Sequence, residues 1–99
     1  MIRHIVLINW KANTTEEQIN AVTASLKKLP ALIPQIKHYH FGVDEKVYPS
    51  NADYALTADF DNIEDFKSYS IHEDHINIMQ SVTADIMQSY FTAQITIDD

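Results

Sequence analysis

The sequence predicts a single α+β domain in which helices pack on one face of a four-stranded antiparallel sheet. Four short segments alternate apolar and polar residues, as strands do. The segments between the first and second strands and between the third and fourth have apolar residues at helical spacing and begin with helix-capping residues. A chain of 99 residues is long enough for one core, so we expect one domain over residues 1–99.

The first predicted strand covers residues 2–10, and both of its faces are largely apolar. One face carries His4, Val6, Ile8 and Trp10, and the other includes Ile5 and Leu7. A strand that is buried on one face only normally shows a cleaner alternation of apolar and polar residues. We therefore expect helices to cover one face of this strand and a second copy of the chain to cover the other.

The first helix is predicted to begin at residues 14–18, where Thr14 with Glu17 or Thr15 with Gln18 has the spacing of a capping box. An apolar stripe follows at helical spacing, formed by Ile19, Val22, Leu26 and Leu29. Pro30 is expected to end this helix, because proline cannot donate the backbone hydrogen bond that an interior position requires.

Residues 36–43 and 53–60 are predicted to form a hairpin whose polar connection covers residues 44–52. The second strand places Tyr39, Phe41 and Val43 on its apolar face, and the third alternates Tyr54, Leu56, Ala58 and Phe60 with smaller or polar residues. His38 and His40 point to the other face of the second strand and are interpreted as structural or surface residues.

Asp61 or Asn62 can cap a short helix that carries Ile63, Phe66 and Tyr69. The chain is expected to bend near residues 70–71, and a further helix to run to about residue 87. Residues 90–97 form the last predicted strand, whose apolar side carries Phe91, Ala93, Ile95 and Ile97. The order β-α-β-β-α-α-β with right-handed crossovers gives a ferredoxin-like arrangement.

Composition excludes several classes of function. The net charge is −7, from 14 acidic and 7 basic residues, so we expect no nucleic-acid partner. One glycine leaves no glycine-rich phosphate loop, and the lack of cysteine excludes disulfides, thiolate ligands and a cysteine nucleophile. No apolar run approaches the roughly 20 residues that span a bilayer, and no signal-peptide pattern precedes the first strand. We therefore expect no membrane partner and a cytoplasmic location.

His72 and His75 are the most informative polar residues. Their spacing places both on one side of the last predicted helix, one turn apart. On a helical projection His75 falls within the apolar stripe and His72 at its edge. His75 should therefore face the sheet, where His4 of the first strand can join it. We expect a pocket there that is also lined by His72, Val6, Ile8, Tyr54 and Met79.

Three interpretations of these histidines remain open. His75 can be a core histidine with one hydrogen bond satisfied, and His72 can serve the helix start. An imidazole is also suited to proton transfer near neutral pH, with Asp74, Tyr69 and Tyr54 as possible partners. His4, His72 and His75 are a rival set of three zinc ligands. Their helical spacing is weaker than that of a zinc protease helix, so we expect no metal and no cofactor.

Four short motifs occur in order over nearly the whole chain: residues 2–7 (IRHIVL), 14–19 (TTEEQI), 29–34 (LPALIP), and Tyr69 followed by His72-x-x-His75. In these motifs the chain resembles the stress-response dimeric α/β-barrel domain family. The resemblance implies a ferredoxin-like protomer whose sheet packs against the sheet of a second copy, so that a barrel forms across the homodimer.

The family includes bacterial proteins of unassigned activity, plant stress-responsive proteins and a plant polyketide cyclase. The resemblance to the cyclase implies an aldol-type condensation in a pocket where His4, His75 and Tyr69 are the catalytic residues. Two departures weaken this implication. Glu73-Asp74 stands where the family commonly has Pro-Ala, and an ungapped alignment places Ala93 where an aspartate commonly orients the helix histidine.

The sequence therefore leaves three functional hypotheses. The first is a homodimer whose histidine-containing pocket binds a small apolar or aromatic metabolite. The second is a cyclase- or isomerase-like enzyme in which His75 is the base, His4 donates a hydrogen bond to the developing oxyanion and Tyr69 orients them. The third is a structural stress protein without a reaction.

Overall fold

A computed structural model describes residues 1–98 and contains the predicted four-stranded antiparallel sheet. Its strands are β1 (Ile2–Trp10), β2 (His38–Val43), β3 (Tyr54–Phe60) and β4 (Met87–Thr96). Their order across the sheet is β2-β3-β1-β4, and each neighbouring pair is antiparallel. This order is that of a ferredoxin-like fold, so the predicted fold class is confirmed.

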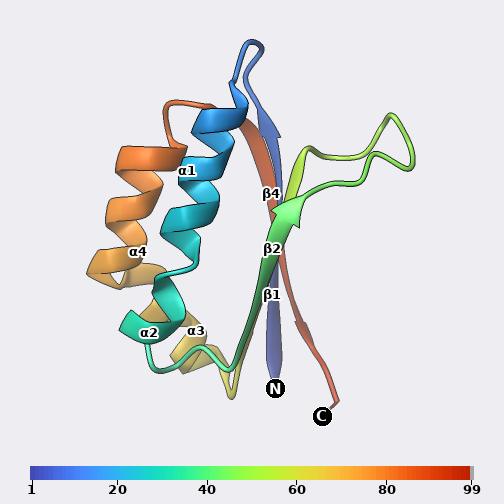
Figure 1. The fold of residues 1–99 in the computed structure, drawn as a ribbon. Helices are drawn as coiled ribbons and strands as arrows, with labels where there is room; N and C mark the ends of the chain where they lie inside the picture. The colour runs from blue at the N-terminus through green and yellow to red at the C-terminus, as the bar shows by residue number, and fades with distance from the viewer. Residues whose placement is uncertain (99) are drawn as a thin grey trace.

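The helices form a layer on one face of the sheet (Figure 1). They are α1 (Glu16–Leu26), α2 (Leu29–Leu32), α3 (Ile63–Ile71) and α4 (Glu73–Ile78), and α4 continues into a π-helical segment η1 (Met79–Thr83). Among residues 1–98 no helix is long and apolar enough to cross a membrane.

The second of the two possible capping boxes begins α1. The Thr15 hydroxyl accepts the Gln18 backbone N–H at 3.2 Å, and the Gln18 side chain accepts the Thr15 backbone N–H at 2.8 Å. The prediction that Pro30 ends this helix is wrong, because α1 ends at Leu26 and Pro30 lies in the first turn of α2. Proline is tolerated there because backbone N–H groups in the first turn of a helix have no acceptor within the helix.

The last strand begins earlier than its sequence pattern indicates. The final helix was expected to reach about residue 87, but η1 ends at Thr83 and β4 already starts at Met87. Trp10 pairs with Met87 after a register shift in which β4 has one extra residue, Gln88, and the Lys11 N–H donates to the Ile86 carbonyl at 2.7 Å. Pairing with β1 therefore overrides the helical periodicity of this segment. Strand β2 begins two residues later than expected, at His38.

The core lies between the sheet and the helices. The even-numbered residues of β1, from His4 to Trp10, face this layer, and so do the residues that the register places directly opposite them on β3 and β4. The fully buried large side chains include Val22 of α1, Leu29 of α2, Tyr54 and Phe60 of β3, and Tyr69 of α3. These side chains join α1, α2 and α3 to the central strand β3.

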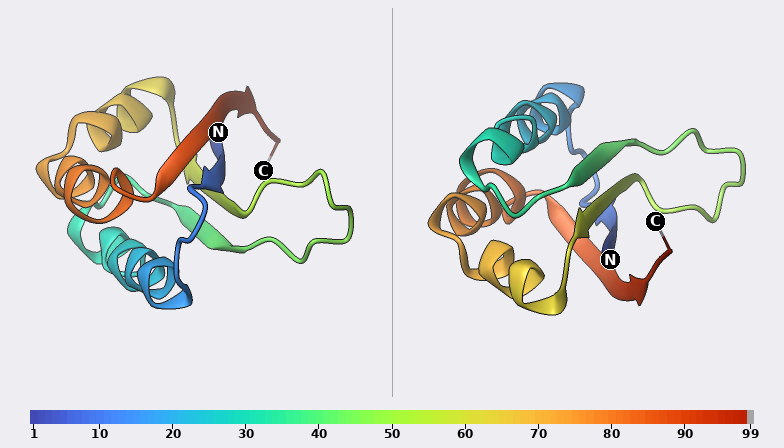
Figure 2. Two further views of the ribbon diagram at one scale, coloured as in Figure 1. Left: turned by 90° about the horizontal axis from the view of Figure 1, so that it is seen from above. Right: turned by 90° about the horizontal axis from the view of Figure 1, so that it is seen from below.

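The opposite face of the sheet, which we call the open face, is not covered by any helix (Figure 2). The register places Ile5 and Leu7 of β1 here, next to Phe91, Ala93 and Ile95 of β4. Leu7, Phe91 and Ile95 are 41%, 67% and 47% exposed. The apolar side predicted for the last strand thus points away from the helices, and its fourth member, Ile97, lies beyond β4.

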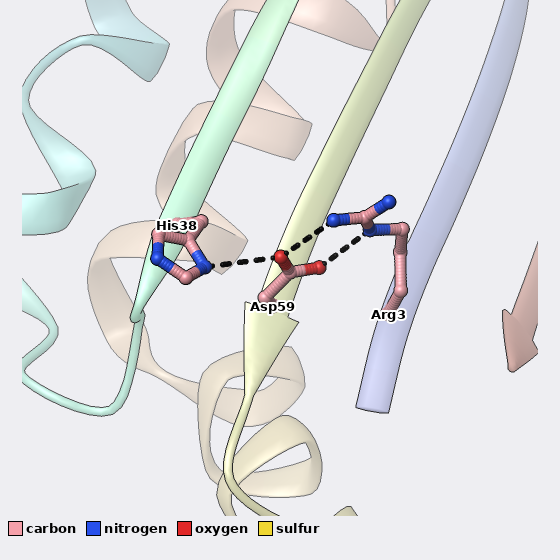
Figure 3. A network of polar contacts seen from close by, with 3 residues as sticks. All are labelled: Arg3, His38 and Asp59. Atoms are coloured by element: carbon pink, nitrogen blue, oxygen red, sulfur yellow. Dashed lines mark hydrogen bonds and ion pairs between the residues drawn. The ribbon is translucent and has the colours of Figure 1, made fainter. Parts of the chain in front are cut away.

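One polar cluster lies on the open face, where the ends of β1, β3 and β2 meet (Figure 3). Asp59 is 2% exposed, and its carboxylate accepts two hydrogen bonds from Arg3, at 2.8 and 2.9 Å. His38 Nδ1 lies 3.1 Å from the same carboxylate. His38 therefore has the structural role that its side of the strand suggested.

Candidate functional site

A cavity of about 280 Å³ lies between the sheet and the helices. Strands β1, β3 and β4 form its floor, and α1, α3, α4 and η1 form its walls. Most of its lining is apolar, and no Asp, Glu, Lys or Arg side chain of residues 1–98 is among the lining residues. The polar side chains in the lining are His4, Tyr69, Ser70, His75, Thr83, Tyr90, Thr92 and Gln94.

His4 lies on the floor of the cavity and is 8% exposed. Its ring packs against Phe66 at a centroid distance of 4.7 Å. Gln94, directly opposite on β4, donates its side-chain N–H to His4 Nδ1 at 3.0 Å. Burial, and then the neighbouring His75, lower the pKa of His4 to about 4. His4 is therefore a neutral imidazole at pH 7.

His75 faces the same cavity from α4. Its Nδ1 lies 3.1 Å from the backbone carbonyl of Ser70, at the end of α3. A carbonyl oxygen can only accept, so Nδ1 carries the proton. Burial lowers the pKa of His75, and the bond to Ser70 opposes this shift only in part. His75 is therefore also neutral at pH 7.

The two hydrogen bonds give the imidazoles opposite tautomers. Nδ1 of His4 accepts from Gln94, so the proton of the neutral ring is on Nε2. Nδ1 of His75 donates to Ser70, so its Nε2 has a free lone pair. One histidine can thus donate a hydrogen bond and the other can accept a proton or a hydrogen bond.

Tyr69 holds the two imidazoles in place. Its ring is 4.4 Å from that of His75 and 6.2 Å from that of His4, measured between centroids. Its hydroxyl lies 2.8 Å from the Tyr39 hydroxyl, and burial raises the pKa of Tyr69 to about 12. A tyrosine that is 2% exposed and so weakly acidic positions the imidazoles rather than exchanging a proton.

Three of the five additional pocket residues predicted from the sequence, Val6, Ile8 and Met79, line the cavity. The other two, His72 and Tyr54, do not. His72 is the N-cap of α4, and its Nδ1 accepts the Asp74 backbone N–H at 3.1 Å, which was the structural alternative for this residue. Tyr54 is fully buried, and its hydroxyl is bonded to Thr23 at 2.7 Å.

Gln94, Ser70 and Tyr39 were not identified from the sequence as site residues. Gln94 follows from the strand register, because it lies opposite His4, whereas Ala93 lies opposite Ile5 and belongs to the open face. An amide therefore stands beside His4, next to the position where the ungapped alignment indicated a missing carboxylate. The carbonyl of Ser70 has no side-chain signal and depends on how α3 meets α4.

No group of three or more His, Cys, Asp or Glu side chains within residues 1–98 is placed to hold a metal ion. Of the three histidines considered as zinc ligands, His4 and His75 share the cavity, and His72 caps α4.

The sequence pattern of the stress responsive A/B barrel domain family matches residues 2–95, so the chain belongs to this family. A solved structure from Thermobifida fusca YX, described as a dimeric ferredoxin-like protein of unknown function, is 35% identical to this chain, with a TM-score of 0.89. That match covers 97% of this chain and 90% of the other. No match was found among curated proteins.

Two further structures are similar over almost their whole length. A dimeric protein of unknown function with a ferredoxin-like fold, from Bacteroides fragilis NCTC 9343, is 25% identical with a TM-score of 0.84, and the match covers 97% of this chain and 95% of that one. A hydroxynitrile lyase from Passiflora edulis is 18% identical with a TM-score of 0.83, and the match covers 99% and 94%. The likeness to the lyase concerns the fold alone.

Proposed function

We propose that this protein is a homodimer that binds a small, uncharged and largely apolar molecule in the cavity between its sheet and its helices. The observation that carries this proposal is the pair His4 and His75, which line one apolar cavity as neutral imidazoles of opposite tautomer. Ligand sites characteristically combine apolar walls with a few convergent polar groups.

The size and charge of the cavity limit its ligand. Its volume of about 280 Å³ is near the lower end of the range for small-molecule sites, so a compact aromatic or short acyl compound fits best. The described lining offers no charged side chain to pair with an ion. Burying a carboxylate or an ammonium there would remove its water without compensation, and this favours a neutral ligand.

The two imidazoles favour a ligand with a carbonyl or hydroxyl group. The Nε2–H of His4 can donate to an oxygen atom, and Nε2 of His75 can accept from a hydroxyl or from an acidic C–H. Phe66 and Leu56 on the lining contribute apolar contacts for the remainder of the molecule.

The dimer in this proposal forms through the open face of the sheet. Leu7, Phe91 and Ile95 are exposed there, and similar structures are described as dimeric. Two such faces packed together would bury the apolar side chains in a closed, barrel-like arrangement.

Binding can be tested with two probes of similar shape, 4-methylacetophenone and 4-methylbenzoate, by saturation-transfer NMR at pH 7. We expect saturation transfer to the neutral ketone and none to the carboxylate. Met79→Trp should fill the cavity and abolish the signal, whereas Ile76→Trp, at an exposed position on the same helix, should preserve it. Equal signals from both probes, or no effect of the Met79 substitution, would overturn the proposal.

A second candidate function is enzymatic proton transfer next to a carbonyl group, as in isomerisation or ring closure. The opposite tautomers favour it specifically. Nε2 of His75 would take a proton from the carbon beside the carbonyl, and the Nε2–H of His4 would donate to the enolate oxygen as negative charge develops there. The lowered pKa of His75 keeps this base unprotonated at pH 7.

This candidate predicts that the protein catalyses deuterium exchange into the acetyl methyl group of 4-methylacetophenone in D₂O, followed by proton NMR. His75→Ala should reduce the exchange to the uncatalysed rate and leave the far-ultraviolet circular dichroism unchanged. Binding without exchange would leave only the binding role. Neither binding nor exchange would favour the structural stress protein instead.

A further inference from the structure

We propose that the connection between β2 and β3, residues 44–53, is an arm that packs against a second copy of this chain. This inference rests on the proposed homodimer and adds a second contact region to it. Ten residues separate the two strands, whereas hairpin connections usually have two to five. Connections of this length that keep a defined shape are commonly functional.

The arm has a built-in shape. The Lys46 ammonium group lies 2.7 Å from the Asn51 carbonyl and 3.0 Å from the Asp53 carboxylate, so one side chain links the outgoing and returning halves. The Asp44 carboxylate accepts the Lys46 N–H at 2.7 Å, which supports the left-handed backbone of Lys46, with φ of 51°. Further along, the Asn51 N–H donates to the Tyr48 carbonyl and closes a turn around Pro49.

The base of the arm is fixed to the sheet. The Asp53 N–H donates to the Ile8 carbonyl at 2.9 Å, and the Asp53 carboxylate accepts the Trp10 N–H at 2.9 Å. The Asp44 N–H donates to the Asp53 carbonyl and extends the β2–β3 ladder by one bond. These contacts set the direction in which the arm leaves the strands that form the open face.

The tip of the arm is apolar and uncovered within one protomer. Val47 is 73% exposed and Tyr48 is 67% exposed, and they are adjacent. The internal bonds of the arm and Pro49 limit its freedom, so the ordering cost of bringing these two side chains into an interface is low. Packing these two side chains against another protein surface would remove their apolar area from water.

The direction of the arm indicates its partner. The helices lie on one side of the sheet, and the arm extends to the other side, beyond the open face (Figures 1 and 2). Two packed sheets are about 10 Å apart, and half of a ten-residue arm reaches at most about 17 Å when extended. An arm of this length passes the plane of a facing sheet and contacts the flank of the second copy. Twofold symmetry then gives two reciprocal arms per dimer.

The experiment compares the dimer dissociation constants of the unmodified chain and three variants by sedimentation equilibrium. Val47→Ser with Tyr48→Ser removes the apolar tip, and it should raise the dissociation constant at least tenfold because each dimer loses two tips. Ile63→Ser with Ile71→Ser is the matched control, since these exposed residues lie on α3 in the helical layer. The control should change the constant less than twofold. Leu7→Lys tests the open face separately.

The outcomes separate this inference from the proposed homodimer. If Leu7→Lys weakens the dimer and the tip variant does not, the arm proposal is wrong and the open-face dimer stands. If the wild type is a monomer at micromolar concentration, both are wrong. A photo-crosslinking residue at position 48 gives an independent measurement: a covalent dimer supports the arm, and crosslinks only within one chain overturn it. Unchanged circular dichroism would show that each variant is folded.

Discussion

His4 is kept from water by the aromatic side chains of α3, and this has a cost at acid pH. Phe66 and Tyr69 pack on the ring, and Gln94 is its hydrogen-bond partner. The environment stabilises the neutral imidazole, whereas the unfolded chain can protonate it freely near pH 6.5. The residue that best supports a binding site therefore also makes the fold sensitive to acid.

The free energy of unfolding should fall as the pH drops from about 6.5 to about 4, because in this range His4 is protonated in the unfolded state but not in the folded state. A pKa lowered from 6.5 to about 4 corresponds to at most about 3 kcal/mol. Urea unfolding of the wild type and of His4→Gln at pH 7, 5 and 4 checks this. Between pH 7 and pH 4, the free energy of unfolding of His4→Gln should fall by up to about 3 kcal/mol less than that of the wild type. Parallel pH profiles of the two proteins would contradict this explanation.

Asp59 has the opposite dependence, because its partners stabilise the charged form. The Arg3 guanidinium, and to a lesser degree His38, hold the pKa of the Asp59 carboxyl below its usual value, although burial opposes this. Its contribution to stability is present above about pH 3.8 and is lost as the pH falls through the lowered folded-state pKa. This cluster fixes the ends of three strands on the open face.

Asp59→Asn should destabilise the fold by about 1–3 kcal/mol at pH 7, because a buried amide cannot replace the charge-assisted bonds to Arg3. Asp61→Asn is the matched control. Asp61 is exposed and lies 3.6 Å from Lys37, so its loss should have little effect. Chemical denaturation of both variants measures the difference. Equal effects of the two substitutions would show that the Asp59 cluster has no special role.

The orientation of individual residues was partly predictable from the sequence. Helical periodicity alone separates His75, which reaches the cavity, from His72, which caps α4. The capping role of His72 needs the break between α3 and α4 at this residue, and periodicity does not locate such a break within one residue. The acceptor for His75 is a backbone carbonyl, which no side-chain pattern can indicate.

At the scale of elements, helix caps hold the site. α3 carries Phe66 and Tyr69, and it begins at Asn62, whose side chain accepts the Asp65 N–H at 2.8 Å. This bond satisfies one of the backbone donors that every helix start leaves without a partner. One exposed side chain therefore stabilises the start of the helix that carries Phe66 and Tyr69.

Asn62→Ala should lower the free energy of unfolding by about 1 kcal/mol, because alanine cannot accept the Asp65 N–H. Asn20→Ala, at an exposed position inside α1, is the matched control and should be neutral or slightly stabilising, since alanine favours helix interiors. Thermal unfolding followed by circular dichroism compares the two. An equal loss in both variants would argue against the cap.

Local sequence patterns predict the helices and strands well, but they predict the first and last residues of these elements less well. Alternation locates all four strands, because successive residues of each strand face opposite sides of the sheet. The start of β4 depends on the pairing of Trp10 with Met87, which is a contact between distant parts of the chain. Pro30 was misplaced because a proline is compatible with both the end of one helix and the start of the next.

In the whole molecule, the two faces of the sheet have different surroundings. Its helix face carries the cavity, and its open face carries apolar side chains that a single protomer leaves in water. The expectation of apolar residues on both faces of β1 agrees with this division: Ile8 is buried beneath the helices, and Leu7 is exposed on the open face. Sequence alternation revealed the second face, but it could not show where the long β2–β3 connection extends.

Leu7→Lys should convert the protein to a folded monomer of 11.4 kDa at micromolar concentration, because an open-face dimer would bury two lysines without partners. Light scattering coupled to size exclusion measures the mass. Ile71→Lys, at an exposed position of α3, should leave the dimer intact. A wild-type mass near that of the monomer, or an intact Leu7→Lys dimer, would contradict the open-face interface.

His4 and His75 share one cavity, and their hydrogen bonds make them neutral imidazoles of opposite tautomer, an assignment that can be measured. Long-range ¹H–¹⁵N correlation NMR of the histidine rings at pH 7 tests it most directly, with His4→Gln and His75→Gln supplying the assignments. We predict a proton on Nε2 of His4 and on Nδ1 of His75, with neither ring charged. The same tautomer for both rings, or a protonated imidazolium at either position, would contradict the account.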